Sequence, residues 1–380
     1  MRILIAIDSF KGSVSSKEAG EAVAEGIRRI PNINAEIEIR PMADGGEGTT
    51  EALVEGIGGA YGAITVDGPL GNRVNAKYGL IPERHLAIIE MAAASGITLI
   101  PPEKRNPLYT TTRGFGQMIR NAIEADGCRR LLLGIGGSAT NDGGAGMLQA
   151  LGFRLLDKNG NDSPHGAAGL EELAEIDIEH ALPQLKQTEI RVACDVKNPL
   201  CGPNGCSAVF GPQKGATPEM ISRMDAALHK FADLTKKVLP NSDMDAPGSG
   251  AAGGLGFALR SFLNARLESG VDIVLQETKL EEAIMKADIV ITGEGRLDAQ
   301  TVMGKAPIGV ARLAKKHGKR VIAFSGCVTP DARVCNDAGI DAFFPVLRTL
   351  CTLDEALANA KQNIADTAEQ VFRALAATPT

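Results

Sequence analysis

Strand-like apolar runs alternate with amphipathic helical segments at both ends of this chain. At the start, the apolar run Arg2–Ile7 precedes a helical pattern over about Ser16–Arg29. Near the other end, the strand pattern Ile289–Thr292 is followed by the helical pattern Pro307–His317, the strand pattern Arg320–Ser325 and, later, a helical pattern over Leu353–Leu375. Apolar strands that alternate with helices are typical of a parallel sheet buried on both faces. The two ends of the chain therefore predict an α/β fold.

The middle of the chain has a different texture, with short strand patterns from Tyr61 to Glu90 joined by Pro and Gly. At 380 residues the chain is also longer than one ordinary domain. We therefore predict two domains, a doubly wound, mostly parallel Rossmann/flavodoxin-like domain from residues 1–68 and 285–380, and an inserted mixed α/β domain from residues 69–284. Because ligands bind between domains and outside the carboxyl ends of parallel strands, we expect the active site in the cleft between the two domains.

Composition and charge narrow the class of function. The formal net charge of -6 and a pI near 5.6 argue against nucleic acid as a partner, because binding to its backbone needs a concentrated basic face. The first apolar stretch stops at Asp8, which is too short for a signal peptide or a membrane span. The seven cysteines are an odd number in a chain that needs no disulfides, so we expect reduced thiols and a cytoplasmic enzyme. A small molecule is the expected partner, and the sequence leaves monomer and homodimer open.

One pattern of the form D-G-G-x-G-x-x-x-A-L occurs twice, starting at Asp44 and at Asp142. An Asp followed by small residues and a helical run is typical of a helix N-cap. The bare glycines allow a ligand to approach the free N–H groups of the first turn, which favour anions such as phosphate or carboxylate. The two copies thus predict two anion sites, although an Asp in this position can also serve only to cap its helix.

The second copy follows the apolar run Leu131–Ile135 and a stretch of small and hydroxylated residues over 136–141. Such a stretch can form a nest of backbone N–H groups suited to an oligophosphate. Gly134, Gly136 and Ala139 also satisfy a relaxed dinucleotide fingerprint, so an NAD-dependent dehydrogenase of a small hydroxy acid is an alternative. A true fingerprint turns directly into its helix, whereas further small residues intervene here.

Other candidate residues follow predicted strands. Asp8, Ser9 and Lys11 follow the first strand, and Glu294, Arg296 and Lys305 come after the run Ile289–Thr292. Two further candidates, Asp195 and Asn198, follow the strand pattern Glu189–Ala193, and Lys214 stands in the turn Gly211–Gly215. Carboxylates, amides and ammonium groups at strand ends are what a phosphotransferase needs around its phosphates and its metal ion.

The chain lacks the P-loop pattern and the motif set of protein kinases, so it belongs to neither of these classes. Five segments together instead resemble the bacterial glycerate kinase family, and the similarity runs from the first residues past Lys305. The segments are Asp8–Ser13, Ala43–Thr49, Gly136–Gly144, Gly211–Gly215 and Thr292–Asp298. Five long motifs in order are far more specific than a single glycine loop.

The resemblance implies transfer of the ATP γ-phosphoryl group to D-glycerate with Mg²⁺, giving 2-phosphoglycerate in glycolate, glyoxylate or sugar-acid breakdown. From residue chemistry we predict a catalytic group of three residues, Asp195 as the base together with Lys11 and Asp8. The expected magnesium ligands are Asp44, Asp142 and Glu294. The residues expected to bind ATP are Gly136, Gly137, Ser138, Thr140, Asn141, Lys214, Gly293, Glu294, Arg296 and Lys305. The residues expected to bind the substrate are Ser9, Asp44, Gly45, Gly46, Glu47 and Asn198. A non-catalytic regulator that binds a phosphorylated ligand on the same loops is a further alternative.

Overall fold

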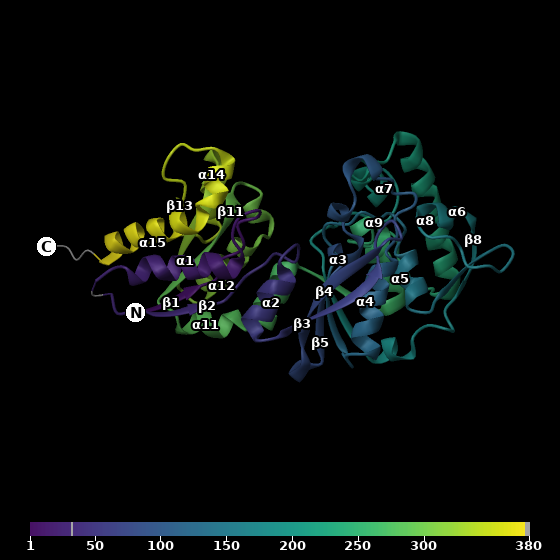
Figure 1. Ribbon diagram of the computed structural model, residues 1–380, viewed down its shortest axis with the longest axis horizontal. Coiled ribbons are helices and arrows are strands. Elements are labelled where there is room, and N and C mark those ends of the chain that lie inside the picture. The colour runs from purple at the N-terminus through teal and green to yellow at the C-terminus, as the bar shows by residue number, and fades with distance from the viewer. Residues whose placement is uncertain (32, 377–380) are drawn as a thin grey trace. The chain divides into compact units, whose positions relative to one another are not determined.

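The structure is a computed structural model that describes residues 1–31 and 33–376 (Figure 1). It divides into two compact units, Met1–Gly58 with Ser269–Thr380, and Gly59–Glu268. The chain's two ends thus share one unit, and the middle of the chain forms the other.

These boundaries differ from the predicted ones at residues 68 and 285. Strand β3 (Ala60–Asp67) pairs along its whole length with β4 (Arg73–Ile81), so it belongs to the sheet of the second unit. Helix α10 (Gly270–Glu277) packs against α2 (Thr49–Ile57), which places it in the first unit. The partner of β3 follows it directly in the sequence, whereas the partner of α10 is more than two hundred positions away, and the two elements lie on the other side of the predicted boundaries.

The first unit contains a five-stranded sheet in the order β13-β12-β11-β1-β2. All neighbouring strands are parallel. The strands are β1 (Arg2–Ile5), β2 (Glu36–Ile39), β11 (Ile289–Leu297), β12 (Arg320–Val328) and β13 (Ala342–Pro345). Counted within this unit, the order is 2-1-3-4-5, the flavodoxin-like arrangement, whose topological switch point lies between β1 and β11.

Helices cover both faces of this sheet, which explains why its strands read as continuous apolar runs. Alternate side chains of β1, such as Ile3 and Ile5, join a core with residues of α1 and α15. These two helices lie side by side (Figure 1). The intervening Leu4 is equally buried, and α11 and α12 contact the strands. The bounds of these helices are α1 (Ser16–Arg28), α11 (Leu280–Lys286), α12 (Ala306–Lys316) and α15 (Ala360–Ala376).

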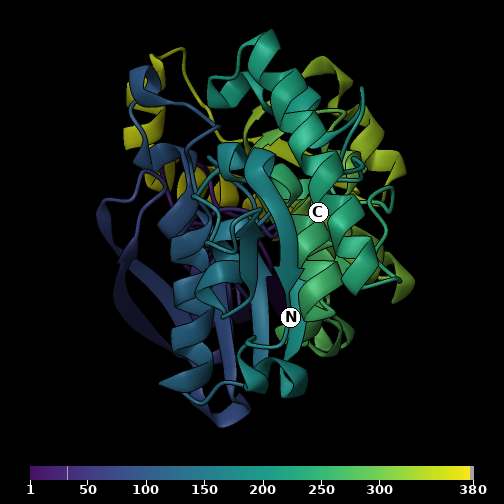
Figure 2. The same ribbon diagram turned by 90° about the vertical axis from the view of Figure 1, so that its right-hand side faces the viewer.

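The second unit contains a six-stranded mixed sheet in the order β10-β9-β6-β5-β4-β3, which faces the viewer in Figure 2. The four strands from β10 to β5 are parallel, and β4 and β3 are antiparallel additions. The strands not yet given are β5 (Leu86–Glu90), β6 (Arg130–Gly134), β9 (Glu189–Ala193) and β10 (Arg266–Glu268), with a separate hairpin of β7 (Arg154–Asp157) and β8 (Leu173–Asp177). Because neighbouring parallel strands end at the same edge, the loops after β6 and β9 lie together.

The helices of the second unit pack with its sheet into one large core. They are α3 (Ala92–Ser95), α4 (Arg113–Glu124), α5 (Ala145–Ala150), α6 (Ala167–Glu172), α7 (Cys206–Phe210), α8 (Pro218–Val238) and α9 (Ala251–Leu263). Helix α9 is interrupted near its start, where Ala252, Gly253 and Gly254 have left-handed backbone angles. In the part of the chain that the structure describes, no helix is both long and apolar enough to span a bilayer.

The predicted fold class is confirmed, and two local predictions needed correction. The strand predicted to end at Thr292 continues to Leu297, because β11 keeps its pairing with β12 through the glycines. The single helix predicted over Leu353–Leu375 is two helices, α14 (Leu353–Ala358) and α15. The expectation that the active site lies in a cleft between the two domains stays a prediction.

Candidate active site

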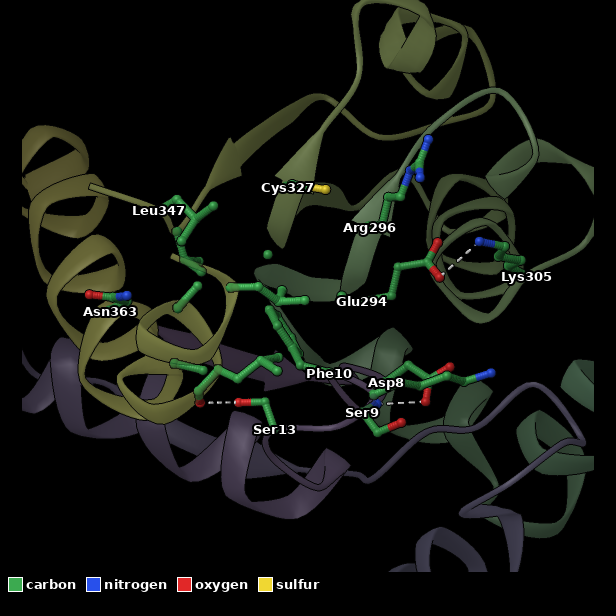
Figure 3. A pocket seen from close by; sticks show the side chains of 18 of the residues that line it. Asp8, Ser9, Phe10, Ser13, Glu294, Arg296, Lys305, Cys327, Leu347 and Asn363 are labelled. Carbon is green, nitrogen blue, oxygen red and sulfur yellow. Dashed lines mark hydrogen bonds and ion pairs between the residues drawn. The ribbon is translucent and has the colours of Figure 1, made fainter. Parts of the chain in front are cut away.

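The first unit has a pocket of about 380 Å³ at the topological switch point of its sheet (Figure 3). The loop that follows β1 supplies Asp8, Ser9 and Lys11 to its lining, and the carboxyl-terminal half of β11 supplies Glu294 and Arg296. This is the position at which open parallel sheets bind ligands, because the connections of adjacent strands leave the sheet on opposite faces there. The fold thus brings together residues that are almost three hundred positions apart in the sequence.

Asp8 is the most perturbed acid of this pocket. Its backbone N–H donates to the carbonyl oxygen of Gly293 at 2.9 Å, and its carboxylate accepts the N–H of Ser9 at 2.6 Å. Burial raises the pKa of Asp8 to about 7, and the negative charges of Asp44 and Glu294 contribute in the same direction. An acid with a pKa near 7 can exchange a proton at neutral pH, which is the property of a catalytic acid or base.

Glu294 lies deep in the pocket and is held by two side chains. Its Oε1 accepts the Thr301 hydroxyl at 3.0 Å, and its Oε2 is 3.2 Å from the Lys305 ammonium. Burial raises the pKa of Glu294, while Lys305 and Thr301 oppose that rise. The preceding Gly293 has φ +153°, and a Cβ there would lie 1.8 Å from the carbonyl oxygen of Phe324. Only glycine therefore permits the strand pairing that carries Glu294 into the pocket.

The first D-G-G copy presents Asp44 to the same pocket. One carboxylate oxygen of Asp44 accepts the N–H of Gly46 at 3.0 Å, and the side chain is only partly buried. Helix α2 begins later, with Gly48 as the N-cap residue, so Asp44 does not cap the helix as the pattern predicted. Gly45 is buried and Glu47 exposed in the same loop. Asp44 therefore keeps oxygen atoms available for a ligand.

Two further cations of the pocket are exposed. Arg296 forms a 3.1 Å ion pair with Asp298, and its side chain is 62% exposed. Lys11 lies in the lining and is also exposed. Exposed, flexible cations contribute little to folding but can meet an incoming phosphate.

The second D-G-G copy has different surroundings. Asp142 is fully buried and its two carboxylate oxygens accept four hydrogen bonds, from the N–H and hydroxyl of Thr112 and from the N–H groups of Gly144 and Gly146. Burial raises its pKa, and these hydrogen bonds oppose the rise. The four bonds occupy the acceptor positions of the carboxylate and anchor the loop within its own unit. The magnesium role expected of Asp142 from the sequence stays a prediction.

The buried side chain of Lys214 supports the loop before Asp142 from inside the unit. The Lys214 ammonium is buried and donates to the Ser138 hydroxyl at 2.8 Å and to the Thr140 carbonyl oxygen at 2.6 Å. Burial lowers the pKa of Lys214 to about 8. Gly136 and Gly137 are exposed at the tip of the loop, and within residues 1–31 and 33–376 their N–H groups make no hydrogen bond. The loop thus presents free N–H groups at its tip, while its base is held in place by hydrogen bonds to Lys214.

Buried polar atoms lie just behind the same loop. Asn141 donates to the Ser207 hydroxyl at 2.8 Å. The Asn141 Oδ1 and Thr140 Oγ1 atoms are buried without a hydrogen-bond partner in the described part of the chain. Both residues are fully buried inside the unit, and their predicted contact with ATP stays a prediction.

Asp195 and Asn198 lie at the neighbouring strand end. Gly134 of β6 is paired with Ala193 of β9, so the loops that follow these two strands leave the same edge of the sheet. Asp195 is exposed, and Asn198 donates its side-chain N–H to the carbonyl oxygen of Asn204 at 2.8 Å. The structure therefore groups the predicted residues twice, around the pocket of the first unit and along one sheet edge of the second.

Sequence reasoning missed the apolar end of the first unit's pocket and the residues that support the second unit's loop. The missed pocket residues include Leu347, Leu353, Leu357 and Asn363, which lie in or near predicted helices and have no local signal. The missed supporting residues are Thr112 and Ser207. Among the described residues, no cluster of three or more His, Cys, Asp and Glu side chains is arranged to hold a metal ion by itself.

Three comparisons with known proteins agree with one another. A model of the glycerate kinase family matches residues 3–376. The Glycerate 2-kinase of Escherichia coli K12 is 50% identical over 377 residues, which cover 99% of this chain and 98% of that protein. The Glycerate kinase of Bacillus subtilis 168 is 48% identical over 98% of this chain and 97% of its own length. The crystal structure of a glycerate kinase 2 candidate from Salmonella typhimurium LT2 is similar with a TM-score of 0.90 and 50% identity, over 99% of this chain and 98% of that one.

Proposed function

This chain belongs to the glycerate kinase family, and we propose that it transfers the γ-phosphoryl group of ATP to a hydroxyl of D-glycerate, giving 2-phosphoglycerate. The observation that carries this proposal is the pocket at the switch point, where Asp8, Asp44 and Glu294 stand with Lys11 and Lys305. Phosphoryl transfer needs cations around the phosphates, a carboxylate for the metal ion and a base or orienting group for the attacking hydroxyl. The pocket contains all three kinds of group.

Asp44 and Glu294 are the residues that would hold Mg²⁺. The donor set fits a bound cation, because Asp44 is partly exposed in the pocket lining and keeps carboxylate oxygen available beside Glu294. Burial is the main cause of the raised pKa of Asp8, the negative charges of Asp44 and Glu294 add to it, and a cation would offset those charges. Mg²⁺ usually binds through one or two protein carboxylates together with substrate phosphates, so a closed cluster of protein ligands is not required. When bound, the ion would neutralise charge on the transferred phosphoryl group.

Two acids can serve as the base that accepts the hydroxyl proton. Asp8 is favoured by its position in the pocket and by a pKa of about 7, which suits proton transfer at neutral pH. Asp195 is favoured by its exposure beside Asn198 at a strand end. If Asp8 is the base, kcat should rise with pH through the ionisation of Asp8, and the Asp8→Asn variant should lose that rise while Asp195→Asn keeps it.

The remaining predicted residues would bind anions. Lys11, Lys305 and Arg296 would contact phosphate oxygens from the first unit. The free N–H groups of Gly136 and Gly137 would bind a further anion in the second unit, with Lys214 supporting the loop through Ser138 and Thr140. Ser9, Gly45, Gly46, Glu47 and Asn198 remain the proposed contacts of the D-glycerate.

Release of ADP from Mg·ATP in the presence and absence of D-glycerate tests the proposal directly. A glycerate-dependent release is expected, and phosphorus NMR of the product would identify the phosphorylated hydroxyl. Absence of glycerate-dependent release would contradict the proposal. It would favour the alternative of a non-catalytic regulator that binds a phosphorylated ligand. The dehydrogenase alternative is disfavoured by the family and by the start of α5 at Ala145, well past the glycines of the supposed fingerprint.

We also propose that the reaction takes place in the cytoplasm, where the cysteines of this chain, all free in the structure, would stay reduced. A monomer would suffice for the chemistry, because each group named above comes from one copy of the chain. A homodimer is equally compatible with the pocket, and light scattering during turnover conditions would distinguish the two.

A further inference from the structure

The pocket at the switch point has two chemically different ends (Figure 3). Asp8, Glu294 and Lys305 lie at one end. The other end is formed by apolar side chains from the loop after β1, from the segment between β13 and α14, and from α14 and α15. These side chains are Phe10, Val346, Leu347, Leu353, Leu357 and Ala360. D-glycerate carries a carboxylate and two hydroxyls on three carbons, so it can account for the polar end only.

We propose that the apolar end binds the adenosine half of ATP and that the triphosphate extends from it toward Lys11 and Lys305. This assignment rests on the proposed function, which supplies ATP as the donor. The cavity of about 380 Å³ falls within the usual size of a small-molecule pocket. Leu353 is 73% exposed and Leu347 40% exposed, which is unusual for leucine side chains that line a cavity. A flat aromatic base would cover them and remove apolar surface from water.

Asn363 provides the polar group that can read the base. Its side chain lines the pocket from α15 (Figure 3), and it makes no side-chain hydrogen bond to any other residue of the described ranges 1–31 and 33–376. A side-chain amide pairs with the N6 amino group and N7 of adenine, where it donates one hydrogen bond and accepts another. Guanine presents two acceptors at the same edge, so this amide favours adenine over guanine.

Two exposed thiols allow a direct test on the unmodified protein. Cys327 lines the pocket, whereas Cys351 is exposed in the segment before α14 and lies outside the lining. Alkylation of each thiol by iodoacetamide can be followed by mass spectrometry with ADP, adenosine or D-glycerate present. We expect ADP and adenosine to slow the alkylation of Cys327 at least about tenfold at saturation, with Cys351 unaffected and D-glycerate without effect on Cys327.

Three results of this experiment would overturn the assignment. They are an unprotected Cys327 at ADP concentrations that saturate the protein by calorimetry, equal slowing of both thiols, and protection of Cys327 by D-glycerate alone. Turnover of Mg·ATP with D-glycerate is measured separately. Turnover with an unprotected Cys327 rejects the adenosine pocket and leaves the proposed function standing. Protection of Cys327 without turnover does the reverse.

Exposed leucines provide matched variants that should fold normally. Leu353→Ser removes a lining side chain, and Leu350→Ser changes a leucine that is fully exposed on the neighbouring segment and outside the pocket. We expect Leu353→Ser to raise the Kd for ADP about tenfold and Leu350→Ser to leave it unchanged. Asn363→Leu should reduce the preference for ATP over GTP about tenfold. Unchanged ADP affinity in Leu353→Ser together with unchanged base preference in Asn363→Leu would overturn the assignment.

Discussion

The two copies of the D-G-G-x-G-x-x-x-A-L pattern have identical spacing and opposite surroundings. Asp44 is partly exposed, lines a pocket and accepts one hydrogen bond, from the N–H of Gly46 in its own loop. Asp142 is fully buried and accepts four hydrogen bonds from its own unit. The same residues therefore place a partly exposed carboxylate in a pocket of one unit and a fully hydrogen-bonded carboxylate inside the other. The difference comes from what packs around each copy and from the loops themselves, since α2 begins at Thr49 after a left-handed Gly48, whereas α5 begins at Ala145 after a left-handed Gly144.

Neutralising the two aspartates should separate these roles most clearly. We expect Asp44→Asn to lower kcat at least about 10²-fold, because a metal or phosphate that loses a fixed ligand is misplaced at the reacting centre. Its free energy of unfolding should change by less than about 0.5 kcal/mol, since within residues 1–31 and 33–376 the Asp44 side chain makes a single hydrogen bond. Steady-state kinetics and urea unfolding measure the two quantities. Glu51→Gln, an exposed acid on the first turn of α2, is the control and should change neither.

The corresponding substitution in the second copy, Asp142→Asn, should have the opposite effects on stability and activity. Here we expect a loss of about 2–5 kcal/mol in the free energy of unfolding, because the amide NH₂ must face backbone N–H donors where a carboxylate oxygen stood. The protein that remains folded should keep its kcat. Thr112→Val, which removes one of the four bonds, should cost less. An Asp142→Asn protein that is stable and inactive would show that the second copy is catalytic after all.

Much of the fold could be predicted, because it follows from local patterns. The strands at β1, β6 and β9 and the helices α1 and α8 come from apolar runs and capping signals that lie within the elements themselves. The different fates of Asp44 and Asp142 could not be predicted in this way. The burial of Asp142 depends on Thr112, thirty positions away, and on the left-handed turn of α9.

The same limit explains what was missed in the pocket. Gly293 was expected to end a strand, since glycine usually weakens one, yet its close approach to Phe324 is what the pairing requires. Asn363 lies in the middle of a helix, so nothing in its neighbourhood marks it as a binding residue. Packing between segments far apart in the sequence decides both cases.

The pH dependence of stability should distinguish the acidic pocket from the rest of the protein. The folded pKa of Asp8 is raised to about 7 from 3.8, so the folded state binds the proton more tightly than the unfolded state does. Stability from this group is therefore greatest at low pH and is lost as the pH rises through 7. Between pH 5 and pH 8 we expect wild type to lose roughly 3 kcal/mol relative to Asp8→Asn in urea unfolding without Mg²⁺. Parallel curves for the two proteins would show that the pKa of Asp8 is not raised in the folded protein.

The second unit should show the opposite slope at higher pH, with a smaller size. Burial lowers the pKa of Lys214 to about 8 from 10.5, so above pH 8 the unfolded state binds the proton more tightly and stability rises with pH. Between pH 8 and pH 9 we expect wild type to gain about 1 kcal/mol relative to Lys214→Met, again by urea unfolding. A flat difference over this interval would mean that the pKa of Lys214 is not lowered in the folded protein and that the amine stays fully charged behind the loop. Its hydrogen bonds to Ser138 and Thr140 would then be those of a permanent ammonium, which would support the glycine loop and attract an anion at every pH in this range.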